Sequence, residues 1–218
     1  FAPTKDSGHT LLKEGIPTSK IVQTGDVMLD ASLLFGELAA KSSKIIHELE
    51  LEEKKFALCT FHRAENVDHR ERLEWIVEGL NEVAERMQVV IPMHPRTRQR
   101  MDSFGLMAKV SPRAKVCPPL GYIDILQLEK HSAMILTDSG GMQKEAFFNR
   151  VPCVTLRTET EWKELLIGGH NRLAIPLVDS IWEKISQVQK SDLDWSVDLY
   201  GNGKSSSTIV DALLENYG

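Results

Sequence analysis

Apolar runs of strand length alternate with amphipathic helical stretches along this chain. Between the runs, apolar side chains follow helical spacing, most clearly from Arg72 to Met87, where the charged side chains occupy the opposite face. Such alternation, with strands that are apolar almost throughout, predicts a doubly wound, Rossmann-like α/β domain whose mainly parallel sheet has helices on both faces. The expected strands cover 21–24, 56–61, 89–93, 115–117, 133–137, 152–156 and 173–175.

The two ends of the chain lie outside this regular pattern. Helices are expected over 7–14 and over 208–216, the second of them after a glycine-rich turn and a polar cluster. The first four residues, Phe-Ala-Pro-Thr, resemble the end of a strand and its turn more than a natural N-terminus. We therefore expect this chain to be a fragment of a longer protein.

Composition and charge restrict the class of protein. The 218 residues suffice for one large or two small domains, with 42% hydrophobic content. No apolar run approaches the roughly 18 residues of a membrane span, and no signal peptide is recognisable, so we expect a cytoplasmic protein without a membrane partner. The net charge of -5 and the scattered basic residues argue against nucleic acid as a partner. Cys59, Cys117 and Cys153 all lie in expected strands, which predicts buried, reduced thiols.

The clearest chemical signal follows the apolar strand that ends at Asp138. The chain turns through Ser139, Gly140 and Gly141 and then begins a helix. The two glycines leave backbone N–H groups uncovered, the helix N-terminus adds unpaired donors and the positive end of its dipole, and Ser139 adds a hydroxyl. This combination predicts an anion site. The structural alternative is a plain strand-to-helix turn capped by Ser139 or Asp138.

Two further expected strands end in a histidine. His62, Arg63 and Glu65 follow one of them, and His94 follows the next. Because the carboxyl ends of parallel strands share one edge of a sheet, we expect these side chains to lie near Ser139. Arg63 can pair with phosphate oxygens, and a protonated His62 can neutralise charge on a departing phosphate. The group therefore suits a diphosphate.

Glu145 and Tyr122 extend this candidate site toward a ribose. We place Glu145 on the first turn of the helix after the two glycines, where its carboxylate can accept hydrogen bonds from both ribose hydroxyls. Tyr122 follows another expected strand at the same sheet edge and is taken as a substrate-binding residue. Structural readings stay open: Glu145 as a helix-dipole partner, and His62 or His94 as a histidine bonded to a neighbouring strand.

Three more specific interpretations of the site have weaker support. A metal site would combine His62, Glu65, Asp68 and His69. These residues lack the i, i+4 spacing of a zinc helix, so no metal is expected. A dinucleotide fold would use Glu159 for the ribose, but the third glycine of its fingerprint is missing. Ser139 also lacks the G-x-S-x-G context of a catalytic nucleophile.

Three separated motifs together resemble those of the non-hydrolysing UDP-N-acetylglucosamine 2-epimerases. They are T-x-H-R-x-E-N at 60–66, P-x-H-P-R at 92–96 and T-D-S-G-G-x-Q-x-E-A at 137–146. The resemblance continues through T-G-D at 24–26, P-C-V-T-L-R at 152–157 and Y-G-x-G-K at 200–204. It covers nearly the whole chain, but only part of the length of the family's members.

The resemblance implies one half of a GT-B-like two-domain enzyme that interconverts UDP-GlcNAc and UDP-ManNAc by elimination and re-addition of UDP. The partner would be the UDP-sugar, no cofactor is implied, and the full-length protein would be a homodimer. Residues 1–25 would be a remnant of the N-terminal domain and linker, 26–198 the UDP-binding domain, and 199–218 a helix crossing back toward the missing domain. In the family, that missing domain carries the carboxylates that transfer the proton, so we expect this chain to be inactive alone.

Residue roles follow from the same motifs. His62 matches the family's active-site histidine, Glu145 its ribose-binding glutamate, and Ser139, Gly140 and Gly141 its phosphate loop. Positions that line a second, effector UDP-GlcNAc in bacterial members correspond to Arg63, Glu65 and His94.

One position departs from the family pattern. Many members have an arginine after a T-E pair, which this chain has at 160–161, but here Trp162 follows, and the lost guanidinium leaves the particular sugar open. Two rival functions stay open as well: the donor domain of a GT-B glycosyltransferase and a non-catalytic nucleotide-sugar-binding module.

Overall fold

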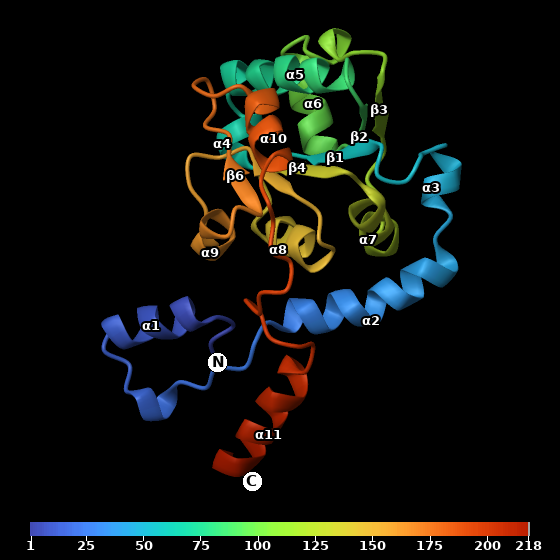
Figure 1. The fold of residues 1–218 in the computed structure, drawn as a ribbon. Coiled ribbons are helices and arrows are strands. Elements are labelled where there is room, and N and C mark those ends of the chain that lie inside the picture. Colours follow the sequence, from blue (N-terminus) through green and yellow to red (C-terminus); the bar gives the residue numbers. More distant parts are fainter. Residues whose placement is uncertain (218) are drawn as a thin grey trace. The chain divides into compact units, whose positions relative to one another are not determined.

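The computed structural model of the protein describes residues 1–217, which form two compact units (Figure 1). The larger unit runs from Ser42 to Trp195, and the smaller one combines Phe1–Lys41 with Ser196–Gly218. Within the described residues, no helix combines the length and the apolar character needed to cross a membrane.

The larger unit is built on one parallel sheet. In the described part of the chain this sheet has six strands in the order β3-β2-β1-β4-β5-β6. The strands are β1 (Phe56–Thr60), β2 (Gln88–Pro92), β3 (Ala114–Cys117), β4 (Met134–Thr137), β5 (Cys153–Thr155) and β6 (Asn171–Leu173). All five neighbouring pairs are parallel. This strand order is that of a doubly wound Rossmann fold, so the fold class predicted from the sequence is confirmed.

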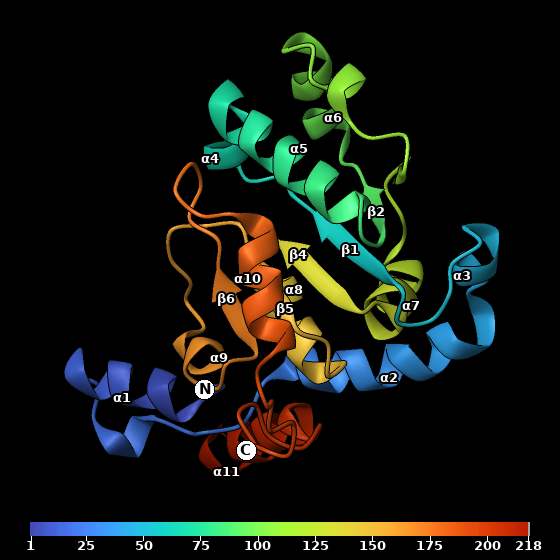
Figure 2. The ribbon, with the colours of Figure 1, turned by 45° about the horizontal axis from the view of Figure 1, so that its top comes forward.

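Helices cover both faces of the sheet (Figure 2). They are α3 (Ile45–Glu48), α4 (Ala64–Val67), α5 (Arg70–Ala84), α6 (Pro95–Ser103), α7 (Tyr122–His131), α8 (Gly140–Phe148), α9 (Lys163–Ile167) and α10 (Ile181–Gln189), with a 3-10 turn η2 (Met107–Lys109). Successive side chains of β1 point to opposite faces. Ala57 and Cys59 pack in a core with α5 and α10, whereas Phe56 and Leu58 pack in a second core with α7 and α8. Burial on both faces explains why the strands are apolar almost throughout.

The smaller unit joins two motifs that are far apart in the sequence. It contains α1 (Lys5–Lys13), η1 (Thr18–Lys20), most of α2 (Val27–Ser42) and α11 (Ser205–Tyr217). Asp30 accepts hydrogen bonds from the backbone N–H groups of Ser205 (3.1 Å) and Ser206 (2.7 Å), which lowers its pKa although partial burial opposes the shift. At Gly25, with φ of 79°, an added Cβ would lie 2.8 Å from the Tyr200 carbonyl oxygen, which explains why T-G-D needs its glycine.

Two expected strands differ from the structure. Residues 21–24 form no strand of the sheet; Gln23 makes only an isolated bridge to Ala2. The last strand begins two residues earlier than expected, because the Asn171 side chain is fixed in the core by Thr155, and Ile175 already belongs to a turn closed by Asp179.

The cysteine prediction is confirmed for two of the three side chains. All three thiols are free, and Cys59 and Cys153 are fully buried, which raises the pKa of each thiol. Cys117 is only half-buried because β3 is an edge strand of the sheet. The assignment of residues 1–25, 26–198 and 199–218 to separate parts of a two-domain enzyme stays a prediction.

Candidate functional site

The chain adds β2 and β3 on one side of β1 and then β4, β5 and β6 on the other side, so the topological switch point lies between β1 and β4. These two strands end level with each other, because Thr60 pairs with Thr137 and their hydroxyl oxygens are 2.9 Å apart. In open α/β sheets, ligands bind outside the carboxyl ends of the strands at this switch point. His62 leaves β1 here and Ser139 leaves β4 here, so two of the predicted site segments meet at the place where a ligand is expected.

Asp138 fixes the loop that carries His62 and Arg63. Its carboxylate is fully buried and accepts hydrogen bonds from the backbone N–H groups of His62 (3.1 Å) and Arg63 (3.0 Å) and from the Asn66 amide (3.0 Å). The half-exposed His62 ring has its Nδ1 atom 3.5 Å from Asp138 Oδ1. From the sequence, Asp138 was considered only as a helix cap. Its central position in this loop was missed.

We expect Asp138→Ala to lower the free energy of unfolding by about 3 kcal/mol or more. The substitution leaves two backbone N–H groups and one buried amide without their acceptor, and each unsatisfied buried group costs on the order of 1–3 kcal/mol. Urea unfolding measures the change. Asp102→Ala is the matched control, because Asp102 is exposed and its side chain pairs with Arg98 on its own helix, so its effect should stay within about 0.5 kcal/mol. Equal effects of the two substitutions would contradict the role of Asp138.

The Ser-Gly-Gly segment begins α8 as the sequence predicted. Ser139 is the N-cap, and its hydroxyl oxygen accepts a hydrogen bond from the Met142 N–H at 3.4 Å. Trp162 donates its indole N–H to the Gly140 carbonyl oxygen at 2.8 Å, and the Lys144 ammonium lies 4.2 Å from the centre of the indole ring. Trp162 therefore fixes the first residue of α8 and brings an ammonium group close to it. The sequence alone indicated only the loss of a guanidinium at this position.

Arginines and carboxylates alternate beside the start of α8. Arg63 lies 3.7 Å from Glu161, which also receives a bidentate hydrogen bond from Arg157 at 2.9 and 3.1 Å. This hydrogen bond lowers the Glu161 pKa. Glu65 lies 3.5 Å from Arg157 Nε. A bound phosphate at the start of α8 would thus compete with Glu161 for the Arg63 guanidinium.

Glu145 lies on the second turn of α8, not on the first as expected from the sequence. Its carboxylate is buried and accepts a hydrogen bond from the Tyr122 hydroxyl at 3.0 Å, so the structure brings two predicted site residues together. The pKa of Glu145 is raised because burial outweighs the hydrogen bond from Tyr122 and the charge of Lys144. The second turn points the side chain toward α7, which carries Tyr122.

His94 lies at the neighbouring strand end. It is the exposed N-cap of α6, and its Nδ1 atom accepts a hydrogen bond from the Arg96 N–H at 3.2 Å. Asp68, one member of the metal alternative, is instead bound by Arg96 at 2.5 Å and by Arg100 at 3.0 Å. These guanidinium groups lower the Asp68 pKa, and they occupy the oxygens that a metal ion would need.

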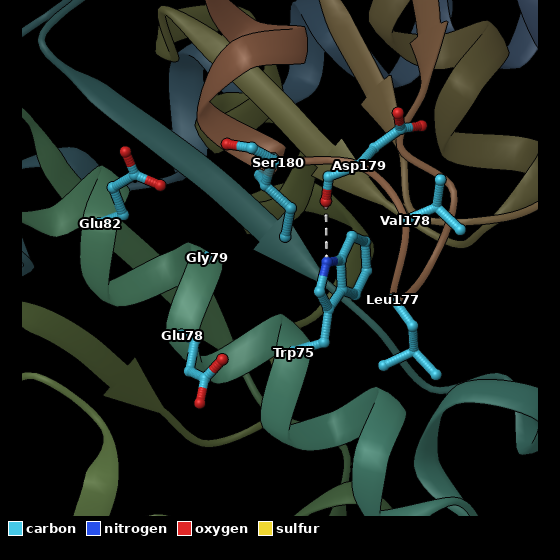
Figure 3. Close-up of a pocket in the computed structure, with 9 residues that line it drawn as sticks. Trp75, Glu78, Gly79, Glu82, Leu177, Val178, Asp179 and Ser180 are labelled. Atoms are coloured by element: carbon cyan, nitrogen blue, oxygen red, sulfur yellow. Dashed lines mark hydrogen bonds between the residues drawn. The ribbon is translucent and has the colours of Figure 1, made fainter.

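A separate groove of about 340 Å³ lies between α5 and the segment before α10 (Figure 3). Trp75 spans it and donates its indole N–H to the Asp179 carbonyl oxygen at 2.9 Å. Leu177 and Val178 are exposed on its rim, and Leu177 has a positive φ of 66°. None of the residues that line the groove belongs to the site predicted from the sequence.

The fold and the strand-end cluster define a Rossmann-like α/β domain whose switch point carries histidine, arginine and carboxylate side chains together with backbone N–H donors. A family model described as UDP-N-acetylglucosamine 2-epimerase matches residues 1–214. The chain belongs to this family, and the resemblance seen in its motifs is confirmed.

Relatives named for different activities have similar identities to this chain. A UDP-N-acetylglucosamine 2-epimerase homolog of Methanococcus maripaludis is 41% identical over 216 residues, covering 98% of this chain and 59% of the relative. The UDP-2,3-diacetamido-2,3-dideoxy-D-glucuronate 2-epimerase of Pseudomonas aeruginosa is 40% identical over 218 residues, covering 99% and 59%.

Solved structures agree with the fold. A crystal structure of the Methanocaldococcus jannaschii UDP-GlcNAc 2-epimerase in complex with UDP-GlcNAc and UDP matches with a TM-score of 0.86 and 38% identity. The match covers 100% of this chain and 60% of that one. The chain thus spans about 60% of the length of its relatives, which agrees with one half of a GT-B-like two-domain architecture.

Proposed function

We propose that this chain is the UDP-binding half of a non-hydrolysing UDP-sugar 2-epimerase that interconverts UDP-GlcNAc and UDP-ManNAc. The observation that carries the proposal is the junction of the His62 loop and the Ser139 loop at the switch point, held by the buried Asp138 carboxylate. The family match favours epimerisation over transfer of the sugar to an acceptor. Full-length protein incubated with UDP-GlcNAc, followed by product analysis, tests the proposal; a glycosyl transfer product or an unchanged substrate would overturn it.

In the proposed reaction, a base removes the proton from C2 of the sugar while the bond between C1 and the diphosphate oxygen breaks. UDP and a 2-acetamidoglucal result. Reprotonation of C2 from the opposite face and re-addition of UDP at C1 then give the epimer. Backbone donors at Ser139, Gly140 and Gly141 would hold the diphosphate, and His62 would stabilise the negative charge that grows on it as the bond breaks.

Glu145 and Tyr122 would hold the ribose, with Glu145 accepting hydrogen bonds from the hydroxyls. Arg63, Glu65 and His94 would line a second sugar-nucleotide site at the β1 and β2 ends. Support for this division comes from their positions: Glu145 and Tyr122 lie together, whereas Arg63 and Glu65 lie among the charged pairs beyond the start of α8.

Because Trp162 replaces an arginine that many family members have, the proposal names a class of sugar and a first candidate within it. One relative at 40% identity is named for a diacetamido-glucuronate, so the substrate class is a UDP-2-acetamido sugar and UDP-GlcNAc is the first member to assay. For the full-length protein we propose a homodimer, which sedimentation would test. We also propose the cytoplasm as its location, supported by the free thiols of Cys59 and Cys153.

Glu145→Ala is expected to weaken UDP binding by about 10-fold or more and to leave inorganic diphosphate binding nearly unchanged. The reason is that hydrogen bonds to a charged carboxylate are worth on the order of 1.5–3 kcal/mol, and only UDP has ribose hydroxyls to donate. Isothermal calorimetry measures both ligands. Glu78→Ala, an exposed glutamate on α5, serves as the control. If both ligands lose affinity equally, Glu145 has a structural role and the ribose assignment is wrong.

A further inference from the structure

A second buried carboxyl group, that of Glu129, lies against Glu145. Glu129 is fully buried on α7, seven residues after Tyr122 and therefore on the same face of the helix. The two carboxyl groups are within hydrogen-bonding reach of each other. Glu129 has no part in the family motifs seen in the sequence, and nothing in the proposed reaction uses it so far.

The hydrogen bonds around this pair leave one oxygen without a donor. The Asn149 amide donates to Glu129 Oε2 at 3.3 Å, and Tyr122 donates to Glu145 Oε1 at 3.0 Å. Glu129 Oε1 is buried and has no hydrogen-bond partner among the described atoms. A buried oxygen of this kind is costly if ionised, but it is satisfied if it carries a proton that it donates to a neighbouring carboxylate.

The charged surroundings favour a single proton on the pair. The Lys144 ammonium acts on Glu145, and the charge of Glu145 acts unfavourably on ionised Glu129. Burial is the main reason that the pKa of Glu129 is raised well above its usual value, and Glu145 adds to the shift. Tyr122 and Cys153 also lie near the pair, but the pKa of each of these groups is itself raised, so both stay neutral.

We propose that Glu129 stays protonated at neutral pH and donates its proton in a hydrogen bond to Glu145, which holds Glu145 as an ionised, oriented acceptor for the two ribose hydroxyls of a nucleoside diphosphate. This inference rests on the proposed function for the ligand. Glu129 is a positioning residue, because it acts on the ligand only through Glu145. The arrangement explains how a carboxylate buried beside another can remain a hydrogen-bond acceptor.

Two substitutions of Glu129 distinguish the effect of its hydrogen-bond donor from the effect of its ionisation. Glu129→Gln keeps a donor toward Glu145, so UDP affinity should stay within about 3-fold of the original chain. Glu129→Met fills similar space without a donor, so UDP affinity should fall by about 10-fold, the value of one lost hydrogen bond to a charged group. Calorimetry with 2′,3′-dideoxy-UDP provides the matched ligand, and its affinity should change less than 2-fold in either variant. Urea unfolding checks that both variants are folded.

The pH dependence gives a second readout. As pH rises through the raised folded-state pKa of Glu129, the proton is lost, and Glu145 then faces a second negative charge in place of a donor. UDP affinity is therefore highest below this raised pKa and declines as pH rises through it. The stability linked to this group is fully present below the pKa of the unfolded state and is lost as pH rises through the folded-state pKa. In the original chain, the affinity for UDP should decline with rising pH more than the affinity for dideoxy-UDP does. Glu129→Gln should remove this difference, because the amide cannot ionise.

The outcomes distinguish this inference from the proposed function. If UDP and dideoxy-UDP bind the original chain equally, the ribose assignment of Glu145 fails and the positioning role fails with it. If UDP is preferred and Glu145→Ala removes the preference, but Glu129→Met does not, only the inference about Glu129 is overturned. Carbon-13 spectra of labelled glutamate carboxyl groups decide the protonation state directly: an ionised Glu129 at neutral pH would overturn the proposal even if UDP does not bind.

Discussion

The purified 218-residue chain is expected to form no UDP-ManNAc from UDP-GlcNAc. Epimerisation needs a group that removes the proton at C2, and the carboxylates of the strand-end cluster described here are all committed to other partners. Asp138 is fully buried and accepts hydrogen bonds from three donors, and Glu145 is buried beside Glu129. Glu65 and Glu161 both pair with Arg157. A domain that covers only one side of the substrate also leaves the reacting atoms open to water.

Product analysis by nuclear magnetic resonance, with the full-length protein as the positive control, measures this outcome. UDP should still bind to the shorter chain, so calorimetry on the same sample shows that the site is intact. Formation of UDP-ManNAc by the 218-residue chain would contradict the expectation, and it would mean that a base lies within this chain.

His62→Ala in the full-length enzyme should lower kcat by about 100-fold while KM changes only a few-fold. A preorganised group that stabilises charge developing in the transition state is typically worth about this factor. The His62 ring is half-exposed at the switch point, and its loop is held in place by the backbone hydrogen bonds to Asp138, so the imidazole does not need to be reoriented during the reaction.

Steady-state kinetics separate the two possible roles of His62. A steep rise in KM with kcat intact would show that His62 binds the phosphate equally in the ground state, and its catalytic assignment would then be withdrawn. His69→Ala is the control. His69 is exposed at the start of α5 and its side chain makes no capping hydrogen bond there, so both kinetic constants should stay near their original values.

Most of the fold of this chain could be predicted from local patterns in the sequence. Strands such as β1 and β4 are buried on both faces and therefore consist of continuous apolar residues, while α5 has one buried and one exposed face with helical spacing. Such periodicities can be seen in the sequence because burial acts on each element separately. Predictions were wrong where a few specific contacts decided the outcome, as for 21–24, which lack a neighbouring strand of the sheet, and for β6, whose start is fixed by Asn171.

The sequence by itself determined the family, the fold class and the segments of the candidate site, since motifs and apolar periodicity are local properties. The tertiary structure alone decided which side chains face one another. Asp138 was found to hold the His62 loop, Trp162 to fix the start of α8, and Glu129 to lie against Glu145. The physical reason is distance along the chain: these contacts join residues 16 to 76 positions apart, and such pairs leave no periodic signal in the sequence.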